Sequence, residues 1–196
     1  DMKFDYPGLK RKNIILSKIN KAKKIIISSH ISSDDDSVSS MLSTYYFITK
    51  YLGKKDSDVK IINTGRKLER WKNIPLFNKI NYVEDIFPEV KKSDLIIFLD
   101  GNSWSRFSKI EDSNSKIGDV MSKEIANCDS KVICIDHHPI MKNNFGIYLV
   151  PKNATSTAEI IYDLFYDDKK IDEISAKLLL LGIIGDTGSF TYIDEE

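Results

Sequence analysis

The chain has 196 residues, 41% of them apolar, and its 29 lysine and arginine residues balance 29 aspartate and glutamate residues. This composition supports one sizeable core, and the zero net charge argues against a protein that binds long duplexes through a basic surface. The two cysteines, Cys128 and Cys134, form no disulfide framework and no paired-cysteine metal motif. We expect both to be buried, reduced thiols.

The first residues contain no apolar segment of the secretory type. No apolar run approaches the ~20 residues that span a membrane. We therefore expect a soluble cytoplasmic protein.

Helical and strand patterns alternate from the start of the chain. Residues 7–23 have an apolar side opposite lysines and arginines, and a proline in the first turn, which predicts a helix. Residues 25–29 form a β-branched run, typical of a strand buried on both faces. A polar loop follows, and apolar residues at helical spacing then predict a helix over 38–52 that ends at Gly53.

The loop before this helix contains three consecutive acids, Asp34, Asp35 and Asp36, close to His30. Acids at a helix start can act as caps that complement the helix dipole, but one would suffice. Three adjacent carboxylates beside a histidine at a strand end repel one another unless they share a cation. We therefore interpret this loop as part of a metal site.

Residues 59–63 predict a second strand, and 64–88 predict short helical pieces with a short strand near Tyr82. This stretch also contains basic side chains, for which a solvated surface is the first interpretation and phosphate binding the alternative: Arg66, Arg70 and Lys72.

Residues 95–99 predict another buried strand, and Asp100-Gly101 after it is either a turn or the position of a metal ligand. The polar loop continues through Arg106 to about Ser115, and 119–127 predict a weak helix.

The run over 132–135 ends in Asp136-His137-His138, and Pro139 prevents the strand from continuing. Three predicted buried strands thus each end in a residue type that binds metals. In open parallel sheets, ligands bind at the carboxyl edge of the strands.

The C-terminal part predicts a strand over 146–150 and then a helix. The segment Ser156-Thr157-Ala158-Glu159 has the spacing of a capping box. Its hydroxyl and N–H groups also suit an anion.

Residues 174–184 predict a helix that is apolar on nearly all sides and therefore buried, with Gly182 and Gly185 allowing close approach of neighbouring chain. Asp186 follows at the helix carboxyl end, where the dipole disfavours an acid by ~0.3–1 kcal/mol. A metal ion would offset this cost. Strands that alternate with helices predict a single α/β domain over residues 1–196, with a mostly parallel sheet flanked by helices.

Two imidazoles and four carboxylates are the candidate ligands, without a thiolate: His30, Asp34, Asp36, Asp100, His137 and Asp186. Mixed nitrogen and oxygen ligation favours Mn²⁺, Mg²⁺ or Co²⁺. Six ligands with four negative charges suit two ions that share a carboxylate, an arrangement used for displacement at phosphorus. Asp136 can orient an imidazole or neighbouring backbone.

These motifs resemble the DHH phosphoesterase superfamily, in particular the N-terminal domain of the bifunctional oligoribonuclease and 3′-phosphoadenosine 5′-phosphate phosphatase type. Its first motif corresponds to His30 through Asp36, its second to Asp100 with Arg106 downstream, and its third to Asp136-His137-His138. Gly185-Asp186-Thr187 resembles the fourth motif, and the Ser156 segment is also similar.

The resemblance implies two Mn²⁺ ions bridged by Asp100. One would be held with His30 and Asp34, and the other with the remaining ligands, Asp36, His137 and Asp186. It implies that Asp100, Asp136, His137 and His138 are catalytic and that substrate contacts come from His138, Arg106, Ser156 and Thr157.

The first motif departs from the family pattern at Ser33 and Asp35, which replace proline and glycine. Asp35 either weakens the binding of anionic substrates or points away from the site. The family's smaller C-terminal domain, with a Gly-Gly-Gly-His motif that grips the substrate, has no counterpart before Glu196, so we expect a one-sided cleft. Either the sequence is truncated, or the protein is a minimal or degenerate member of the family.

The leading hypothesis is a Mn²⁺-dependent phosphoesterase that hydrolyses small nucleotides or short single-stranded oligoribonucleotides, without a membrane partner and with a homodimer as an open option. A pyrophosphatase similar to family II is the alternative within the enzyme class. A non-catalytic module that binds nucleotides or metal is the alternative from another class.

Overall fold

The computed structural model describes residues 6–125, 131–139, 147–151, 153–166 and 170–185. Its strands form one sheet in which every pairing is parallel, in the order β3-β2-β1-β4-β5-β6. The strands are β1 (Ile25–Ser29), β2 (Val59–Asn63), β3 (Ile80–Tyr82), β4 (Leu95–Leu99), β5 (Val132–Ile135) and β6 (Ile147–Leu149). The predicted α/β class with a parallel sheet is confirmed.

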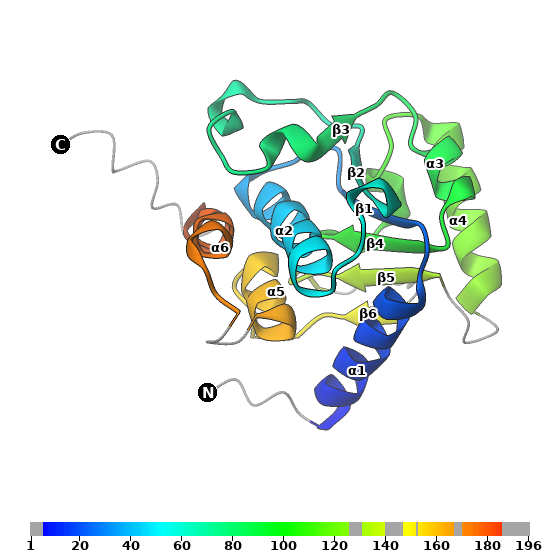
Figure 1. The fold of residues 1–196 in the computed structure, drawn as a ribbon. Helices are drawn as coiled ribbons and strands as arrows, with labels where there is room; N and C mark the ends of the chain where they lie inside the picture. The colour runs from blue at the N-terminus through cyan, green and yellow to red at the C-terminus, as the bar shows by residue number, and fades with distance from the viewer. Residues whose placement is uncertain (1–5, 126–130, 140–146, 152, 167–169, 186–196) are drawn as a thin grey trace.

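Helices flank the sheet on both sides, and Figure 1 shows α2, α5 and α6 together on the side opposite α3 and α4. The α-helices are α1 (Tyr6–Lys21), α2 (Asp35–Tyr46), α3 (Phe87–Lys92), α4 (Glu111–Ile125), α5 (Thr157–Phe165) and α6 (Glu173–Gly185). Shorter helical segments are η1 (Phe47–Tyr51), η2 (Asp56–Asp58), η3 (Glu69–Trp71), η4 (Phe77–Lys79) and η5 (Trp104–Arg106).

The order of the strands reverses between β1 and β4. From β1 the chain builds outward through β2 and β3, and from β4 it builds outward in the other direction. The pairing runs from Ile25 opposite Leu95 to Ser29 opposite Leu99, so the two strands end side by side. In open α/β sheets, ligands bind at such a reversal, beyond the carboxyl ends of the strands.

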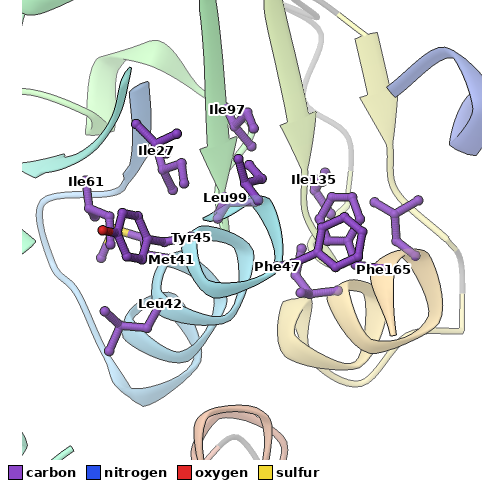
Figure 2. Packing of buried hydrophobic residues seen from close by; sticks show 14 of the residues in the cluster. Ile27, Met41, Leu42, Tyr45, Phe47, Ile61, Ile97, Leu99, Ile135 and Phe165 are labelled. Carbon is purple, nitrogen blue, oxygen red and sulfur yellow. The ribbon is translucent and has the colours of Figure 1, made fainter. Parts of the chain in front are cut away.

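Alternate residues of the strands supply two separate hydrophobic cores, as the two-residue period of a strand requires. Ile27, Ile97 and Ile135 face the side of α1, α2, α5 and α6, and Figure 2 shows them on the same side as labelled side chains of α2, η1 and α5. Ile96 and Phe98 face the opposite side, where α3 and α4 lie. Because both faces are covered, the runs contain no polar alternation, as predicted.

The strands lie within one or two residues of the predicted ranges, whereas two helices differ. The helix predicted over 38–52 begins at Asp35 and continues into the π-helical segment η1, where Phe47 stacks on Phe165 with ring centroids 4.6 Å apart. The predicted start at residue 119 is wrong, because α4 begins at Glu111. Its first turns are polar and hold their place through tertiary hydrogen bonds, such as Ser113 Oγ to Asp85 Oδ1 at 2.6 Å. The short helix α3 was not predicted.

The prediction that the last helix is buried all round is wrong. Leu180 is 51% exposed and Ile174 is 38% exposed, because α6 packs against α2 and α5 with one side only. The predicted close approach at Gly182 is confirmed, since a Cβ there would lie 2.6 Å from Cβ of Ala158. No helix among the described residues is long and apolar enough to cross a bilayer.

Candidate metal centre

The carboxyl ends of β1, β4 and β5 bring three predicted ligands together. His30 follows β1, Asp100 follows β4, and His137 comes two residues after β5. Nε2 of His30 lies 3.3 Å from Oδ2 of Asp100, and Nε2 of His137 lies 3.4 Å from Oδ1 of the same carboxylate. The two oxygens of Asp100 therefore face two different imidazoles.

Asp100 is buried and adopts a left-handed backbone conformation with φ of 57°. Such a conformation costs a residue other than glycine of order 1–3 kcal/mol and is found mostly where function requires it. Burial raises the pKa of this carboxyl, but hydrogen bonds from the imidazoles of His137 and His30 outweigh it and hold the pKa well below its usual range. Asp100 is therefore an anion inside the protein, which favours a bound cation.

The first turn of α2 supplies two further acids with different partners. Asp34 caps the helix, because its Oδ1 accepts the N–H of Ser37 at 2.9 Å while Ser37 Oγ accepts the N–H of Asp34. The cap does not exclude ligation, since His30, Asp34 and Asp100 each offer a ligand atom within 4.8 Å of the others. The capping and metal-binding interpretations of Asp34 are thus compatible.

Asp36 is buried against the start of α5. Its two oxygens accept the backbone N–H groups of Thr157 and Ala158, both at 2.8 Å, and Oδ2 lies 3.5 Å from Nε2 of His137. A helix N-terminus stabilises an anion through its free N–H groups and dipole. The anion at the start of α5 is therefore Asp36, and these two N–H groups are engaged within the protein.

The hydroxyls predicted to contact substrate are buried and have protein partners. Ser156 Oγ accepts the N–H of Glu159 at 3.1 Å, and Thr157 Oγ1 donates to Oδ1 of Asp100 at 3.1 Å. The predicted capping box is only half formed, because the Glu159 carboxylate accepts the N–H of Thr155 instead of that of Ser156. A substrate contact by Ser156 or Thr157 stays a prediction.

Asp136 is fully buried and organises the third motif. Its Oδ1 accepts the N–H of His137 at 2.8 Å and lies 2.7 Å from Nδ1 of His138. Its Oδ2 accepts a hydrogen bond from Nδ2 of Asn102 at 2.8 Å. The hydrogen bond with Asp136 raises the pKa of His138, whose side chain is 49% exposed. A ring held through Nδ1 presents Nε2 as its remaining hydrogen-bonding atom.

Asn102 is a site residue that the sequence reasoning missed. It lies two residues after Asp100, is buried, and also donates to the backbone oxygen of Pro139 at 2.9 Å. The signal in the sequence is its place in the polar stretch after a buried strand. In that stretch, only Asp100 is predicted as a metal ligand.

Asp35, the departure in the first motif, is engaged by the segment after β2. Its Oδ1 accepts a hydrogen bond from Nε1 of Trp71 at 2.7 Å and lies 2.9 Å from a guanidinium nitrogen of Arg70. This carboxylate is therefore paired within the protein, and its effect on anionic substrates stays a prediction.

Arg106 is exposed, and its backbone oxygen accepts the N–H of Ile31 at 2.7 Å, which places it beside the first motif. Asp186 and Cys128 lie outside the described residues. Cys134 is buried as predicted and its thiol contacts the backbone oxygen of Gly101 at 3.1 Å. Burial raises the pKa of this thiol well above its usual range, so it does not add a thiolate ligand.

The arrangement fits divalent metal ions. Two donor atoms that share one ion at ~2.1 Å and meet at roughly 90–110° lie about 3.0–3.4 Å apart, close to the 3.3–3.5 Å between imidazole nitrogens and carboxylate oxygens here. A direct charge-assisted hydrogen bond is shorter, at about 2.7–2.9 Å. Nδ1 of buried His30 has no hydrogen-bond partner among the residues that the structure describes, so structural hydrogen bonds do not saturate this ring.

The model of the DHH family N-terminal domain matches residues 24–183. The chain belongs to the DHH family. This match confirms the resemblance to the DHH superfamily that the sequence motifs indicate. Three of the four motifs that carry the resemblance lie within the matched range.

Several relatives are larger proteins. The chain is 30% identical over 179 residues to the probable bifunctional oligoribonuclease and PAP phosphatase NrnA of Streptococcus mutans, covering 91% of this chain and 50% of that protein. It is 37% identical over 79 residues to the cyclic-di-AMP phosphodiesterase PdeA of Listeria monocytogenes, covering 37% of this chain and 12% of that protein. The chain thus spans about half the length of its Streptococcus relative.

A solved structure of an exopolyphosphatase-related protein from Bacteroides fragilis is also similar, with a TM-score of 0.70 and 26% identity. The aligned region covers 96% of this chain and 53% of that protein. This chain therefore shares the fold of that structure over nearly its whole length.

Proposed function

We propose that residues 1–196 act as one DHH catalytic domain, a metal-dependent phosphoesterase that hydrolyses phosphate esters of small nucleotides or short oligoribonucleotides. Two divalent ions, preferably Mn²⁺, would be held by His30, Asp34, Asp36, Asp100, His137 and Asp186. The proposal is supported by family membership and by the geometry at the carboxyl edge of the sheet.

The observation that carries the proposal is the position of Asp100. One of its oxygens faces His30 at 3.3 Å and the other faces His137 at 3.4 Å. Asp100 also belongs to both groups of described residues whose ligand atoms lie within 4.8 Å of one another, which are His30, Asp34 and Asp100, and Asp100, Asp136, His137 and His138. A carboxylate between two ligand groups is the arrangement that lets two ions share one acid.

The ligand chemistry favours a hard or borderline ion. Imidazole and carboxylate ligands suit Mn²⁺, with Mg²⁺ or Co²⁺ as substitutes, and the neighbouring Cys134 stays a protonated thiol. Bound divalent ions lower the pKa of a coordinated water toward ~7 and stabilise charge on phosphoryl oxygens.

The chain's own residues would position the phosphate. Asp136 holds the His138 ring through Nδ1, so Nε2 can donate a hydrogen bond to a phosphate oxygen. Asn102 and the backbone N–H groups of His137 and His138 hold Asp136 in turn. Burial of Asp136 keeps competing water away from this bond, and exposed Arg106 supplies a positive charge beside the site.

The substrate proposal draws on the relatives, whose names include oligoribonuclease, PAP phosphatase and cyclic-di-AMP phosphodiesterase. We therefore place nucleotides with a phosphomonoester or phosphodiester first. A pyrophosphatase of the family II kind is the alternative within the enzyme class. A binding module without turnover is the alternative outside it.

The test is release of phosphate or nucleotide by this chain with Mn²⁺, offered a short RNA, 3′-phosphoadenosine 5′-phosphate, a cyclic dinucleotide and pyrophosphate in parallel. The control variant is Asp100→Asn, because asparagine tolerates the left-handed conformation at φ of 57° better than alanine does.

Turnover of a nucleotide by the wild type alone would support the proposal and identify the substrate class. Turnover of pyrophosphate alone would replace it with the pyrophosphatase alternative. Mn²⁺ binding without turnover of any substrate would contradict catalysis by this chain and favour the binding module.

A further inference from the structure

The segment from Asn63 to Trp71 lies along the first motif and contacts both of its ends. At one end, Nδ2 of Asn63 donates to the backbone oxygens of Ser29 and His30 at 3.4 and 3.3 Å. Gly65 comes so close that a Cβ there would lie 2.4 Å from the backbone oxygen of Ile31. A residue with a side chain could not take this position without a shift of the backbone.

At the other end, the same segment reaches Asp35. Nε1 of Trp71 donates to its Oδ1 at 2.7 Å, and the Arg70 guanidinium lies 2.9 Å from the same oxygen. Trp71 is only 1% exposed and packs edge-on against Phe77, while Arg70 lies over the Trp71 ring at 5.0 Å. Of the two anchors of Asp35, Trp71 is therefore a fixed part of the core, whereas Arg70 is largely exposed.

The chain between these contacts holds the proposed ligands. His30 and Asp34 are separated by a loop without regular secondary structure, and Asp36 lies in the first turn of α2. Ordering such a backbone costs roughly 1–2 kcal/mol per residue. A loop that is already held at both ends binds a metal ion more tightly than a loose loop does. The free energy of binding is then not reduced by the entropic cost of ordering the loop.

We propose that residues 63–71 act as a splint that holds His30, Asp34 and Asp36 at metal-binding spacing, and that Asp35 is the positioning residue through which the splint acts. The inference rests on the proposed metal centre. It gives a role to the acid that departs from the family pattern: Asp35 does not bind an ion itself but fixes the two acids on either side of it.

A simpler explanation is that Asp35 and Arg70 influence a cation only through their charges. The two explanations differ in sign. If charge alone matters, removing the positive charge of Arg70 strengthens cation binding. If the splint matters, Arg70→Gln weakens it, since one of the two anchors of Asp35 is lost. Trp71→Phe changes no charge and still removes an anchor.

The experiment is calorimetric titration of the full chain with Mn²⁺. We expect the Kd to rise about 10- to 100-fold in Trp71→Phe and Asp35→Ala, the range typical when a residue that orients metal ligands is lost, and to rise less in Arg70→Gln. The matched control is Trp104→Phe, the same change at the only other tryptophan. Its ring packs against Gly118 of α4, and its Kd should equal that of the wild type.

A second measurement covers the case in which Trp71→Phe does not fold. In a Trp104→Phe background Trp71 is the only indole, and Mn²⁺ should change its fluorescence because its N–H is bound to Asp35. Asp35→Ala should abolish this response in protein whose circular dichroism is unchanged. Unaltered Mn²⁺ affinity in Asp35→Ala, or tighter binding in Arg70→Gln, overturns the splint. Absence of Mn²⁺ binding by the wild type instead overturns the metal centre itself.

Discussion

The two ends of α2 each contain a cluster around buried or half-buried acids, and the clusters differ in how well the acids are satisfied. At the C-terminal end, Asp172 accepts hydrogen bonds from the hydroxyls of Tyr46 and Tyr51 at 2.7 and 3.0 Å and from the N–H of Ser175 at 2.9 Å. At the N-terminal end, Asp100 faces imidazoles at 3.3 and 3.4 Å. Asp172 is held by short hydrogen bonds, whereas the contacts of Asp100 with the imidazoles have about the length expected between two ligands of one ion.

We propose that this difference separates a structural acid, Asp172, from a metal-binding one, Asp100. Asp172 joins the end of α2 and the segment η1 to the start of α6. Its hydrogen bond from the N–H of Ser175 caps α6, and those from the hydroxyls of Tyr46 and Tyr51 hold α2 and η1 beside it. Asp100 combines burial and a left-handed backbone with long contacts to two imidazoles and one hydrogen bond from the Thr157 hydroxyl, and its backbone conformation reduces stability. On this proposal, the residues for stability and for metal binding lie at opposite ends of α2.

The largest expected effect comes from replacing Asp100 and Asp172 in two separate variants that are compared with each other. Asp100→Asn should reduce turnover by more than the ~100-fold typical of losing a residue that orients a ligand, and should abolish the rise in melting temperature on adding Mn²⁺. A wild-type site filled at 100 times its Kd gains about 2.7 kcal/mol. The measurement is thermal unfolding with and without Mn²⁺, beside the activity assay.

Asp172→Ala should show the reverse pattern. It leaves the Tyr46 hydroxyl and the Ser175 N–H without this acceptor, whereas the Tyr51 hydroxyl keeps the backbone oxygen of Lys170. The free energy of unfolding should fall by about 1–3 kcal/mol, while the added stability from Mn²⁺ stays as in the wild type. Loss of the Mn²⁺ response in Asp172→Ala, or its retention in Asp100→Asn, would contradict the division of roles.

An intermediate effect is expected from Asn102. It lies beside the proposed metal centre and, like Asp172, makes short hydrogen bonds. Asn102→Ala removes the donor to Oδ2 of Asp136 and should lower kcat about 10- to 100-fold through misorientation of His138. Mn²⁺ affinity should change less than turnover does, since Asn102 supports His138 rather than an ion. Asn114→Ala, which loses hydrogen bonds around Ser108 on the far side of the sheet, is the control for loss of a buried amide.

The contrast between the clusters also explains which features the sequence reveals. His30, Asp100 and His137 are recognisable because each follows a buried β-branched strand, and parallel strands bring their carboxyl ends to one edge. The same logic predicted the α/β class and nearly all of the strands.

Contacts between distant segments leave no such signal. The hydrogen bonds from the start of α5 to Asp36, and from Trp71 to Asp35, join residues more than 30 positions apart. The predicted start of α4 is too late for the same reason, because Ser113 and Asn114 are weak helix formers locally and Ser113 is held by Asp85, 28 positions away.

The smallest expected effect is a pH dependence that belongs to the structural cluster. Burial raises the pKa of Asp172, but hydrogen bonds from Ser175, Tyr46 and Tyr51 outweigh it and lower the pKa from 3.8 to about 2. A group whose pKa is lower in the folded state stabilises the fold above its unfolded pKa. That contribution is lost as the pH falls from about 4 toward 2.

The comparison is therefore urea unfolding of the wild type and Asp172→Asn between pH 3 and pH 7, in protein freed of metal with a chelator so that the other cluster does not contribute. The stability difference between the two should be constant above about pH 5 and should shrink below pH 4, because only the wild type must protonate this carboxyl. If the stability difference stays the same down to pH 3, the charge of Asp172 does not contribute to stability. The side chain would then join α2 to α6 by its size and hydrogen-bonding geometry alone.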